Sequence, residues 1–338
     1  MKEQTQEDTM PGFDSVIGLE EVVEYLQNII KTDKVVQTYI FYGEKGTGKK
    51  LLSGILAMTL QCEKHGIEPC LECPSCKKAE TRNHPDIITV YHEKPASIGI
   101  DEIRAQLVDD ILIRPECSPY KIYIVPEAEK MTTQAQNALL KTLEDLPKYA
   151  KIFLLTDNVD MLLPTIRSRC VHLAMRLVSE PKVKKYLMDA CDVPDYYAEL
   201  DAAYAQGNIG KARDIATSGE FHSRVDTCVE ILSRSYHMPM VQVNDCVKRL
   251  TEEKADIDEY LELFTMWFRD ILLFKATAEV DKLVFRRQLD MIKKRASQSS
   301  YEGLQEILNA IEKVKTRLKS NVNFELSIEL LLLTIREN

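Results

Sequence analysis

The sequence of 338 residues lacks any apolar run that approaches the ~20 residues needed by a membrane-spanning helix. It also lacks an excess of positive charge, because 53 acidic side chains against 44 lysines and arginines give a net charge of −9. Unaided binding to nucleic acid usually needs a basic surface, so we expect any DNA contact to be shared with partner proteins. No basic region leads into an apolar core in the first ten residues, which predicts a cytoplasmic protein.

Internal repeats and low-complexity segments are absent as well, and the 45% hydrophobic content is enough for the cores of two or three domains. Short apolar runs alternate with amphipathic helical segments in the first half of the chain. The strand candidates are Tyr39–Tyr42, Ile87–Tyr91, Lys121–Val125 and Lys151–Thr156. This alternation predicts an α/β domain with a mostly parallel sheet, flanking helices and a ligand site at the carboxyl ends of the strands.

Strand-like runs disappear after about residue 177, and only helical periodicity continues to the end of the chain. We expect the α/β domain to span 1–177, a small helical domain 178–220 and a larger helical domain 221–338. Two apolar stripes in the last domain are expected to be core, with a smaller chance of also serving a subunit interface. They consist of Leu261, Phe264, Phe268, Ile271 and Leu272, and of Leu304, Ile307, Ile311 and Val314.

A glycine-rich segment, GEKGTGKK at residues 43–50, lies between a strand candidate and the helix-like segment LLSGILAMTL. A phosphate-binding loop needs this order, because glycines let the backbone approach phosphates and the first amides of the helix point toward them. The alternative, an ordinary glycine-rich turn, is disfavoured by the flanking strand and helix. The candidate nucleotide-binding residues are Gly43, Gly46, Thr47, Gly48, Lys49 and Lys50.

Two positions depart from a hydrolysing phosphate loop. Lys50 stands where a Ser or Thr hydroxyl would bind magnesium, and Pro126 stands where a strand normally ends in a magnesium-holding Asp. Glu127 follows at the position of the carboxylate that polarises the attacking water, although a solvated loop carboxylate is an equal alternative. Both protein groups expected to hold magnesium are therefore missing. The retained Lys49 leads to the hypothesis that ATP or ADP still binds as a structural ligand, without hydrolysis.

Four cysteines lie within fifteen residues in the pattern C-x7-C-x2-C-x2-C. This pattern predicts a structural Zn²⁺ site with a closed tetrahedral shell. The nearby His65 is a possible substitute ligand, but four thiolates already complete the shell. Unrelated loop thiols are the less favoured alternative, because such clusters rarely form in a reducing cytosol without a metal. The predicted metal ligands are Cys62, Cys70, Cys73 and Cys76.

Two arginines, Arg167 and Arg169, follow the last strand candidate. Physical reasoning favours ordinary exposed charges. The alternative is an arginine offered across a subunit interface to the γ-phosphate bound by a neighbour, where such a side chain can raise the rate about a thousandfold or more. Spacing along the sequence does not decide between them.

Residues from about 10 to 175 resemble the bacterial clamp-loader subunits of the AAA+ class. The segments that carry the resemblance are FDSVIG at 13–18, the glycine-rich segment, the four cysteines, IDEIR at 100–104, AQNALLKTLE at 135–144 and LLPTIRSRC at 162–170. Beyond residue 175 the similarity is a shared helical character, with a weaker echo in Trp267–Asp270.

Within that family, ATP-hydrolysing motors (gamma/tau) differ from the delta-prime type, which has eroded ATPase motifs but keeps the SRC arginine. The departures at Lys50, Pro126 and Gly210 place this chain with the delta-prime type. Gly210 stands near the sequence position at which the motors carry a nucleotide-sensing arginine. The resemblance implies that Arg169 acts in trans on a motor's ATP. It does not extend to Arg167, which we expect to be a structural or DNA-facing charge.

The resemblance further implies a stator in a ring of five that contains gamma/tau and delta. The region 178–220 would be its lid and 221–338 its oligomerisation collar. The ring would open the sliding clamp and seat it on primer-template DNA within the DNA polymerase III holoenzyme, a DNA-directed DNA polymerase (nucleotidyltransferase), at the nucleoid-associated replisome.

Two other readings stay open at this point. The chain could be an active AAA+ ATPase that draws its magnesium ligands from water and phosphate, which hydrolysis by the isolated chain would reveal. It could also be a nucleic-acid-binding protein that reads through its cysteine module. The acidic net charge and the scarcity of basic and aromatic residues around the cysteines disfavour this second reading.

Overall fold

The computed structural model describes residues 12–92, 94–320 and 322–338. The first ten residues, from which the absence of a leader was predicted, lie outside this range. The chain forms two compact units: the first runs to Tyr186 and includes Gln206–Lys211, and the second comprises Leu187–Ala205 and Ala212–Asn338. The division crosses the region expected to be a lid, and the domain borders at 177 and 220 remain predictions.

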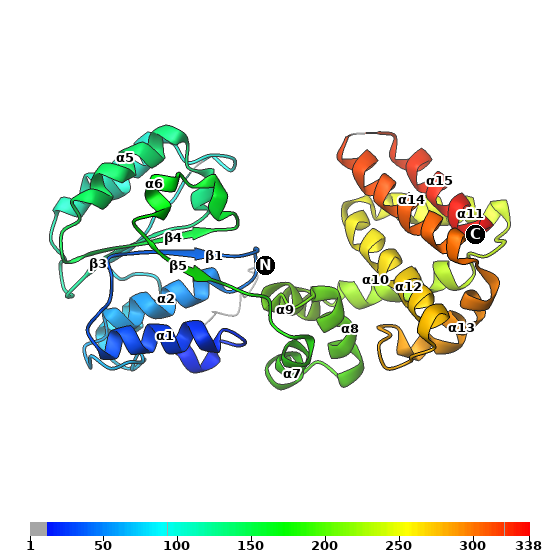
Figure 1. The fold of residues 1–338 in the computed structure, drawn as a ribbon, viewed down its shortest axis with the longest axis horizontal. Coiled ribbons are helices and arrows are strands. Elements are labelled where there is room, and N and C mark those ends of the chain that lie inside the picture. The colour runs from blue at the N-terminus through cyan, green and yellow to red at the C-terminus, as the bar shows by residue number, and fades with distance from the viewer. Residues whose placement is uncertain (1–11, 93, 321) are drawn as a thin grey trace, which may run out of the picture. The chain divides into compact units, whose positions relative to one another are not determined.

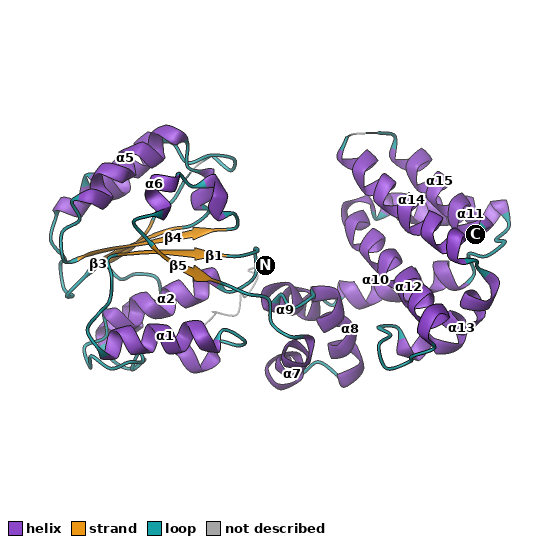
Figure 2. Ribbon diagram, in the orientation of Figure 1, coloured by secondary structure: helices purple, strands orange, loops and turns teal. Residues whose placement is uncertain are grey.

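The first unit contains a sheet of five parallel strands in the order β2-β3-β4-β1-β5 (Figure 2). The fold class predicted from the sequence, an α/β domain followed by helical regions, is confirmed. The strands are β1 (Thr38–Tyr42), β2 (Ile87–Thr89), β3 (Lys121–Val125), β4 (Ala150–Thr156) and β5 (Val171–Ala174). The edge strand β5 was not predicted, because only Leu173 of its four residues is buried and no apolar run marks it.

Helices cover both faces of this sheet, as Figure 1 shows, with α1 and α2 on one side and α5 and α6 on the other. Successive residues of β1 point to opposite faces, so Phe41 packs in the core with α1 and α2 while Ile40 packs in the core with α5. The helices of this unit are α1 (Glu20–Lys31), α2 (Lys49–Leu60), α3 (Pro74–Glu80), α4 (Ile100–Ile103), α5 (Thr133–Glu144) and α6 (Pro164–Arg167).

The helical periodicity seen over residues 98–113 corresponds to three different kinds of turn. The short α4 passes into a π-helical turn over Arg104–Val108 and then into a 3-10 turn over Asp110–Leu112. The apolar residues Ile103, Leu107 and Ile111 nevertheless all point into the core, so the pattern marked burial correctly.

Only helices follow the sheet in the described part of the chain. They are α7 (Glu180–Cys191), α8 (Asp195–Ala205), α9 (Ile209–Ser218), α10 (Glu220–Ser233), α11 (Met240–Glu252), α12 (Ile257–Thr277), α13 (Leu289–Gln298), α14 (Tyr301–Lys319) and α15 (Phe324–Glu337). The two predicted apolar stripes lie on α12 and α14 and belong to one core around Trp267, with Leu272 partly buried. No helix among the described residues is long and apolar enough to cross a membrane.

Candidate functional site

The glycine-rich segment forms a turn between β1 and α2, as its sequence predicts. Gly46 and Gly48 have φ angles of 91° and 90°, which lie in the left-handed region that favours glycine. Gly48 ends the turn directly before α2, whose first residue is Lys49. The loop thus has the strand, turn and helix of a phosphate site at the carboxyl end of β1.

The side chain of Lys49 folds back into this turn. Its Nζ donates to the carbonyl oxygens of Gly43 and Glu44 at 2.5 and 2.7 Å, and it lies 2.7 Å from Oδ1 of Asp157. The Thr47 hydroxyl donates to the same Glu44 oxygen at 2.8 Å. The neighbouring Lys50 is exposed. The turn is therefore held together by contacts from within the chain.

The carboxylate of Glu127 is paired with two basic side chains. It lies 3.0 Å from Lys130 and 3.1 Å from His92, and the hydrogen bond from Lys130 holds the pKa of this carboxyl below its usual value. His92 follows β2, whereas the phosphate loop follows β1 on the other side of β4. The role of Glu127 as the water-polarising base remains a prediction.

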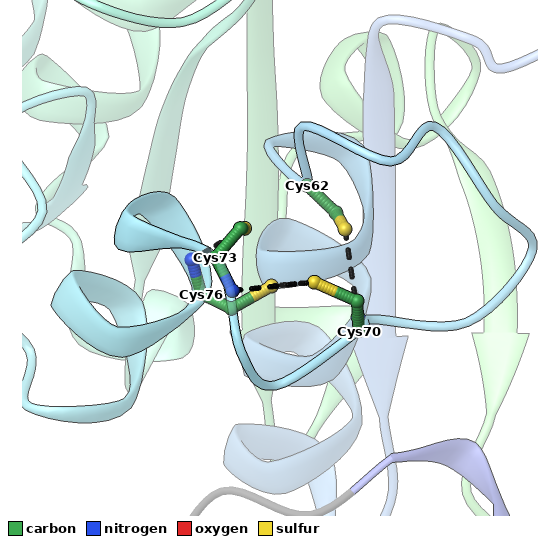
Figure 3. Close-up of side chains that lie close together, drawn as sticks. All are labelled: Cys62, Cys70, Cys73 and Cys76. Carbon is green, nitrogen blue, oxygen red and sulfur yellow. Dashed lines mark hydrogen bonds between the residues drawn. The ribbon is translucent and has the colours of Figure 1, made fainter.

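The four predicted zinc ligands gather in one place, with all their sulfur atoms within 4.8 Å of one another (Figure 3). Tetrahedral Zn²⁺ with bonds of about 2.3 Å needs sulfur atoms about 3.8 Å apart, so the cluster has the right size. Hydrogen bonds from the N–H groups of Glu72 and Cys73 lower the pKa of Cys70 to about 6, which favours the thiolate, whereas burial raises the pKa of Cys76. The donor set and its spacing fit Zn²⁺.

The cysteine module is fixed to the rest of the first unit. Cys62 follows the end of α2, and Cys73 and Cys76 pack with Met58 of that helix. The loop between Cys62 and Cys70 is tied down by Glu68, whose carboxylate accepts the N–H of Phe13 at 3.0 Å. A metal here would brace α2, the helix that begins at the phosphate loop.

A second group of potential ligands, His84, Asp86 and Cys117, lies close to this module. Its polar atoms already have partners within the protein. The Asp86 carboxylate accepts the N–H groups of Glu116 and Cys117, and both ring nitrogens of His84 have hydrogen-bond partners. This group therefore joins loops and offers no free shell for a metal.

Arg169 lies near the amino end of β1, whereas the phosphate loop follows the carboxyl end of the same strand. Its carbonyl oxygen accepts a hydrogen bond of 2.7 Å from the hydroxyl of Thr38, the first residue of β1. The phosphate loop begins after Tyr42, about 13 Å along the strand at ~3.3 Å per residue. The guanidinium lies 2.7 Å from the Glu144 carboxylate and donates to the Thr165 carbonyl. The Arg169 side chain as a whole is 39% exposed. Arg169 is thus available to a neighbouring molecule and remote from its own loop.

Arg167 makes different contacts. Its guanidinium pairs with Asp160 at 2.6 Å, and its carbonyl oxygen is bonded by His172 at 2.9 Å. These contacts tie the turn before α6 to β5. A structural role accounts for this side chain.

Three residues of the site were not singled out in the sequence: Asp157 beside Lys49, Glu144 beside Arg169, and Asn208 on the phosphate loop. The position of Asp157 directly after β4 carried a usable signal, because the neighbours of β1 end at the same edge of a parallel sheet. Asn208 carried none, since 163 positions separate it from its partner.

Comparison with known proteins identifies related sequences. The family described as DNA polymerase III, delta subunit matches residues 18–179, and the C-terminal family of the same name matches residues 222–337. The chain is 30% identical over 320 residues to DNA polymerase III subunit delta' of Bacillus subtilis, covering 94% of this chain and 95% of that protein. It is 27% identical to subunit tau of the same organism, covering 91% of this chain but only 58% of tau.

Among solved structures, a gamma-subunit-related protein of Thermotoga maritima aligns with a TM-score of 0.47 and 20% identity. The alignment covers 93% of this chain and 98% of that structure. The DNA clamp loader delta protein of Bacillus subtilis aligns with a TM-score of 0.36 and 12% identity, over 93% and 99% of the two chains.

Proposed function

The chain belongs to the family of DNA polymerase III delta' subunits, and we propose that it is a stator of the clamp loader that hydrolyses no ATP itself. In this role it supplies Arg169 to the ATP site of a neighbouring motor subunit. Its partners are gamma/tau and delta in a ring of five, and the assembled ring loads the sliding clamp on primed DNA. Its site of action is the cytoplasmic replisome at the nucleoid.

The placement of Arg169 carries this proposal. Its backbone is fixed to the start of β1 by Thr38, while the chain's own phosphate loop follows the end of β1. An arginine at this edge can reach only a phosphate held by another molecule. The substitutions at Lys50 and Pro126 support the other half of the proposal, because they remove both protein groups that would hold magnesium for hydrolysis.

Hydrolysis by reconstituted clamp loaders tests the Arg169 role. Complexes carrying the wild-type chain, Arg169→Ala or the matched control Arg167→Ala are compared in a single-turnover burst, after gel filtration has verified assembly. Arg169→Ala should slow the one adjoining site on the order of a thousandfold, so that the burst loses the amplitude of that site. Arg167→Ala should keep the full burst. A full burst with Arg169→Ala contradicts the proposal, and ATP hydrolysis by the isolated chain supports an active motor.

The cysteine cluster supports a second proposal, a structural Zn²⁺ bound by Cys62, Cys70, Cys73 and Cys76. A shell of four thiolates leaves no open position for a substrate, so the metal would stabilise the module and the end of α2. Elemental analysis of the purified chain should find one zinc per chain. Cys73→Ser should lose this zinc, and Cys117→Ser, which alters an exposed thiol outside the cluster, should keep it.

A further inference from the structure

The ammonium group of Lys49 has no donor left for a phosphate. A lysine ammonium carries three N–H donors, and three oxygen atoms lie 2.5–2.7 Å from Nζ: the carbonyls of Gly43 and Glu44 and Oδ1 of Asp157. The Lys49 side chain is 10% exposed, whereas that of Asp157 is 47% exposed. An incoming phosphate oxygen must therefore displace Asp157, the one partner that is a mobile side chain and carries the same charge sign as phosphate.

The fold fixes Asp157 in this position. In the parallel register Tyr42 pairs with Thr156, and the N–H of Gly43 donates to the Thr156 carbonyl at 3.2 Å. The next residue, Asp157, therefore lies directly beside the first glycine of the loop. The carboxylate of Glu129 accepts the N–H of Asp157 at 3.2 Å and holds the turn from its other side.

A second set of contacts, made by residues at the start of α9, closes the loop. The Asn208 amide donates to the Lys45 carbonyl at 2.7 Å, while its oxygen accepts the N–H of Lys211 and caps the helix. The N–H of Gly210 donates to the Gly46 carbonyl at 2.9 Å. We call Asn208 and Gly210 the latch. Both latch residues and the loop belong to the first compact unit.

The latch explains why glycine stands at position 210. A Cβ atom there would lie 2.6 Å from the carbonyl oxygen and 2.7 Å from the Cα of Gly46, both of which are backbone atoms that cannot turn aside. Likewise, a Cβ at Gly46 would lie 2.4 Å from the Asn208 side chain. The phosphate loop and the start of α9 pack so closely that neither position 46 nor position 210 has room for a Cβ atom.

We propose that Asp157 is an internal substitute for a nucleotide phosphate and that the latch holds the loop in this closed state. The chain then keeps the shape of a nucleotide-binding loop while excluding nucleoside di- and triphosphates. This inference rests on the proposed stator function, because a subunit that turns over no ATP needs a loop whose shape persists without nucleotide. The nucleotide expected at Lys49 from the sequence competes with an intramolecular carboxylate.

Binding of the fluorescent nucleotide mant-ADP to the full chain tests the inference, first without added magnesium and then with it. Asp157→Asn keeps the shape of the side chain but removes its charge. It should bind mant-ADP at least tenfold more tightly than wild type. Asp160→Asn is the matched control, because this exposed carboxylate lies three residues away and pairs with Arg167 instead. Its affinity should equal that of wild type, and adding Lys49→Ala to Asp157→Asn should abolish the gain.

The double variant Asp157→Asn/Asn208→Ala shows whether the latch alone still excludes the nucleotide, and circular dichroism verifies that each variant is folded. The inference is overturned if neither the single nor the double variant binds mant-ADP more tightly than wild type. The assay contains no second subunit and no hydrolysis step. Its failure is therefore distinguishable from a failure of the Arg169 proposal, which the burst experiment measures separately.

Discussion

The carboxyl ends and the amino ends of the strands, here called the carboxyl edge and the amino edge of the sheet, differ in what they offer to other molecules. At the carboxyl edge, the phosphate loop has the glycines and lysine of a nucleotide site, yet Lys49 is saturated by Gly43, Glu44 and Asp157. At the amino edge, Arg169 is held through its backbone by Thr38 and through its guanidinium by Thr165 and Glu144, and 39% of its side chain is exposed.

In the proposed stator, this difference would let a nucleotide-binding fold lose hydrolysis at its own loop and still supply an arginine to a neighbour. Strand β1 connects the two edges, so the loop that follows it still shapes the sheet from which Arg169 is presented. A loop held by its own contacts can support the sheet without binding or hydrolysing a nucleotide. Four changes, ordered by the size of their expected effect, separate the two edges experimentally.

Metal removal should have the largest effect, and it should act at the end of α2, where Gln61 donates to the carbonyls of Asp86 and Tyr120 directly before β2 and β3. Chelation of zinc, or Cys73→Ser, removes the brace at the end of α2, and we expect a loss of several kcal/mol in the free energy of unfolding of the first unit. Hydrogen exchange should accelerate in α3 and at the end of α2, while residues 164–174 near Arg169 keep their protection. Cys117→Ser is the control. An unchanged melting temperature after complete chelation would contradict a structural metal.

Gly210→Ala should come next and should act at the carboxyl edge. The added methyl group meets the Gly46 backbone at 2.6 Å, and overpacking of this kind costs about 1–3 kcal/mol. Urea unfolding gives the loss of stability. Gly99→Ala is a suitable comparison, because its Cβ would meet only the flexible end of the Glu102 side chain. If Gly210→Ala proves as stable as wild type, the latch is not closely packed in solution.

Thr38→Val should act on the amino edge. The substitution keeps the shape of the side chain but removes the hydroxyl that holds the Arg169 carbonyl, at a cost of about 1 kcal/mol. We expect a weaker ATPase burst in the reconstituted complex. Thr59→Val, which removes a buried hydroxyl bonded within α2, should cost similar stability and leave the burst intact. Equal bursts from the two variants would mean that Thr38 does not position Arg169.

Features set by neighbouring residues could be predicted further from the sequence than contacts between distant segments. Local patterns predicted β1, β3, β4, the turn at Gly46–Lys49 and the gathering of the four cysteines, because neighbouring residues determine each of them. Pairings between distant segments left no such trace. The contact between Asn208 and Lys45 spans 163 positions, and β5 lacks the apolar run that would reveal a strand.

The SRC arginine illustrates the same limit. Its identity could be read from LLPTIRSRC, but its orientation depends on Glu144, which is 25 positions away, and on the hydroxyl of Thr38. Sequence spacing therefore identified Arg169 but could not distinguish an ordinary exposed charge from an arginine offered across a subunit interface. Only the fold reveals its position at the start of β1, and this position supports the proposal that Arg169 serves a neighbour.

Glu144→Gln should have the smallest effect on stability and gives the sharpest test of presentation. Glu144 is the last residue of α5, where the helix dipole disfavours a carboxylate, so losing its half-exposed ion pair with Arg169 should change stability by less than about 0.5 kcal/mol. The ion pair and the bond from Nη1 to the Thr165 carbonyl orient the guanidinium, which has five N–H groups and so keeps others for a phosphate. Loss of the ion pair should slow the burst about two- to fivefold, the equivalent of up to about 1 kcal/mol. A normal burst together with normal stability would show that Arg169 finds its orientation from the neighbouring subunit instead of from its own chain.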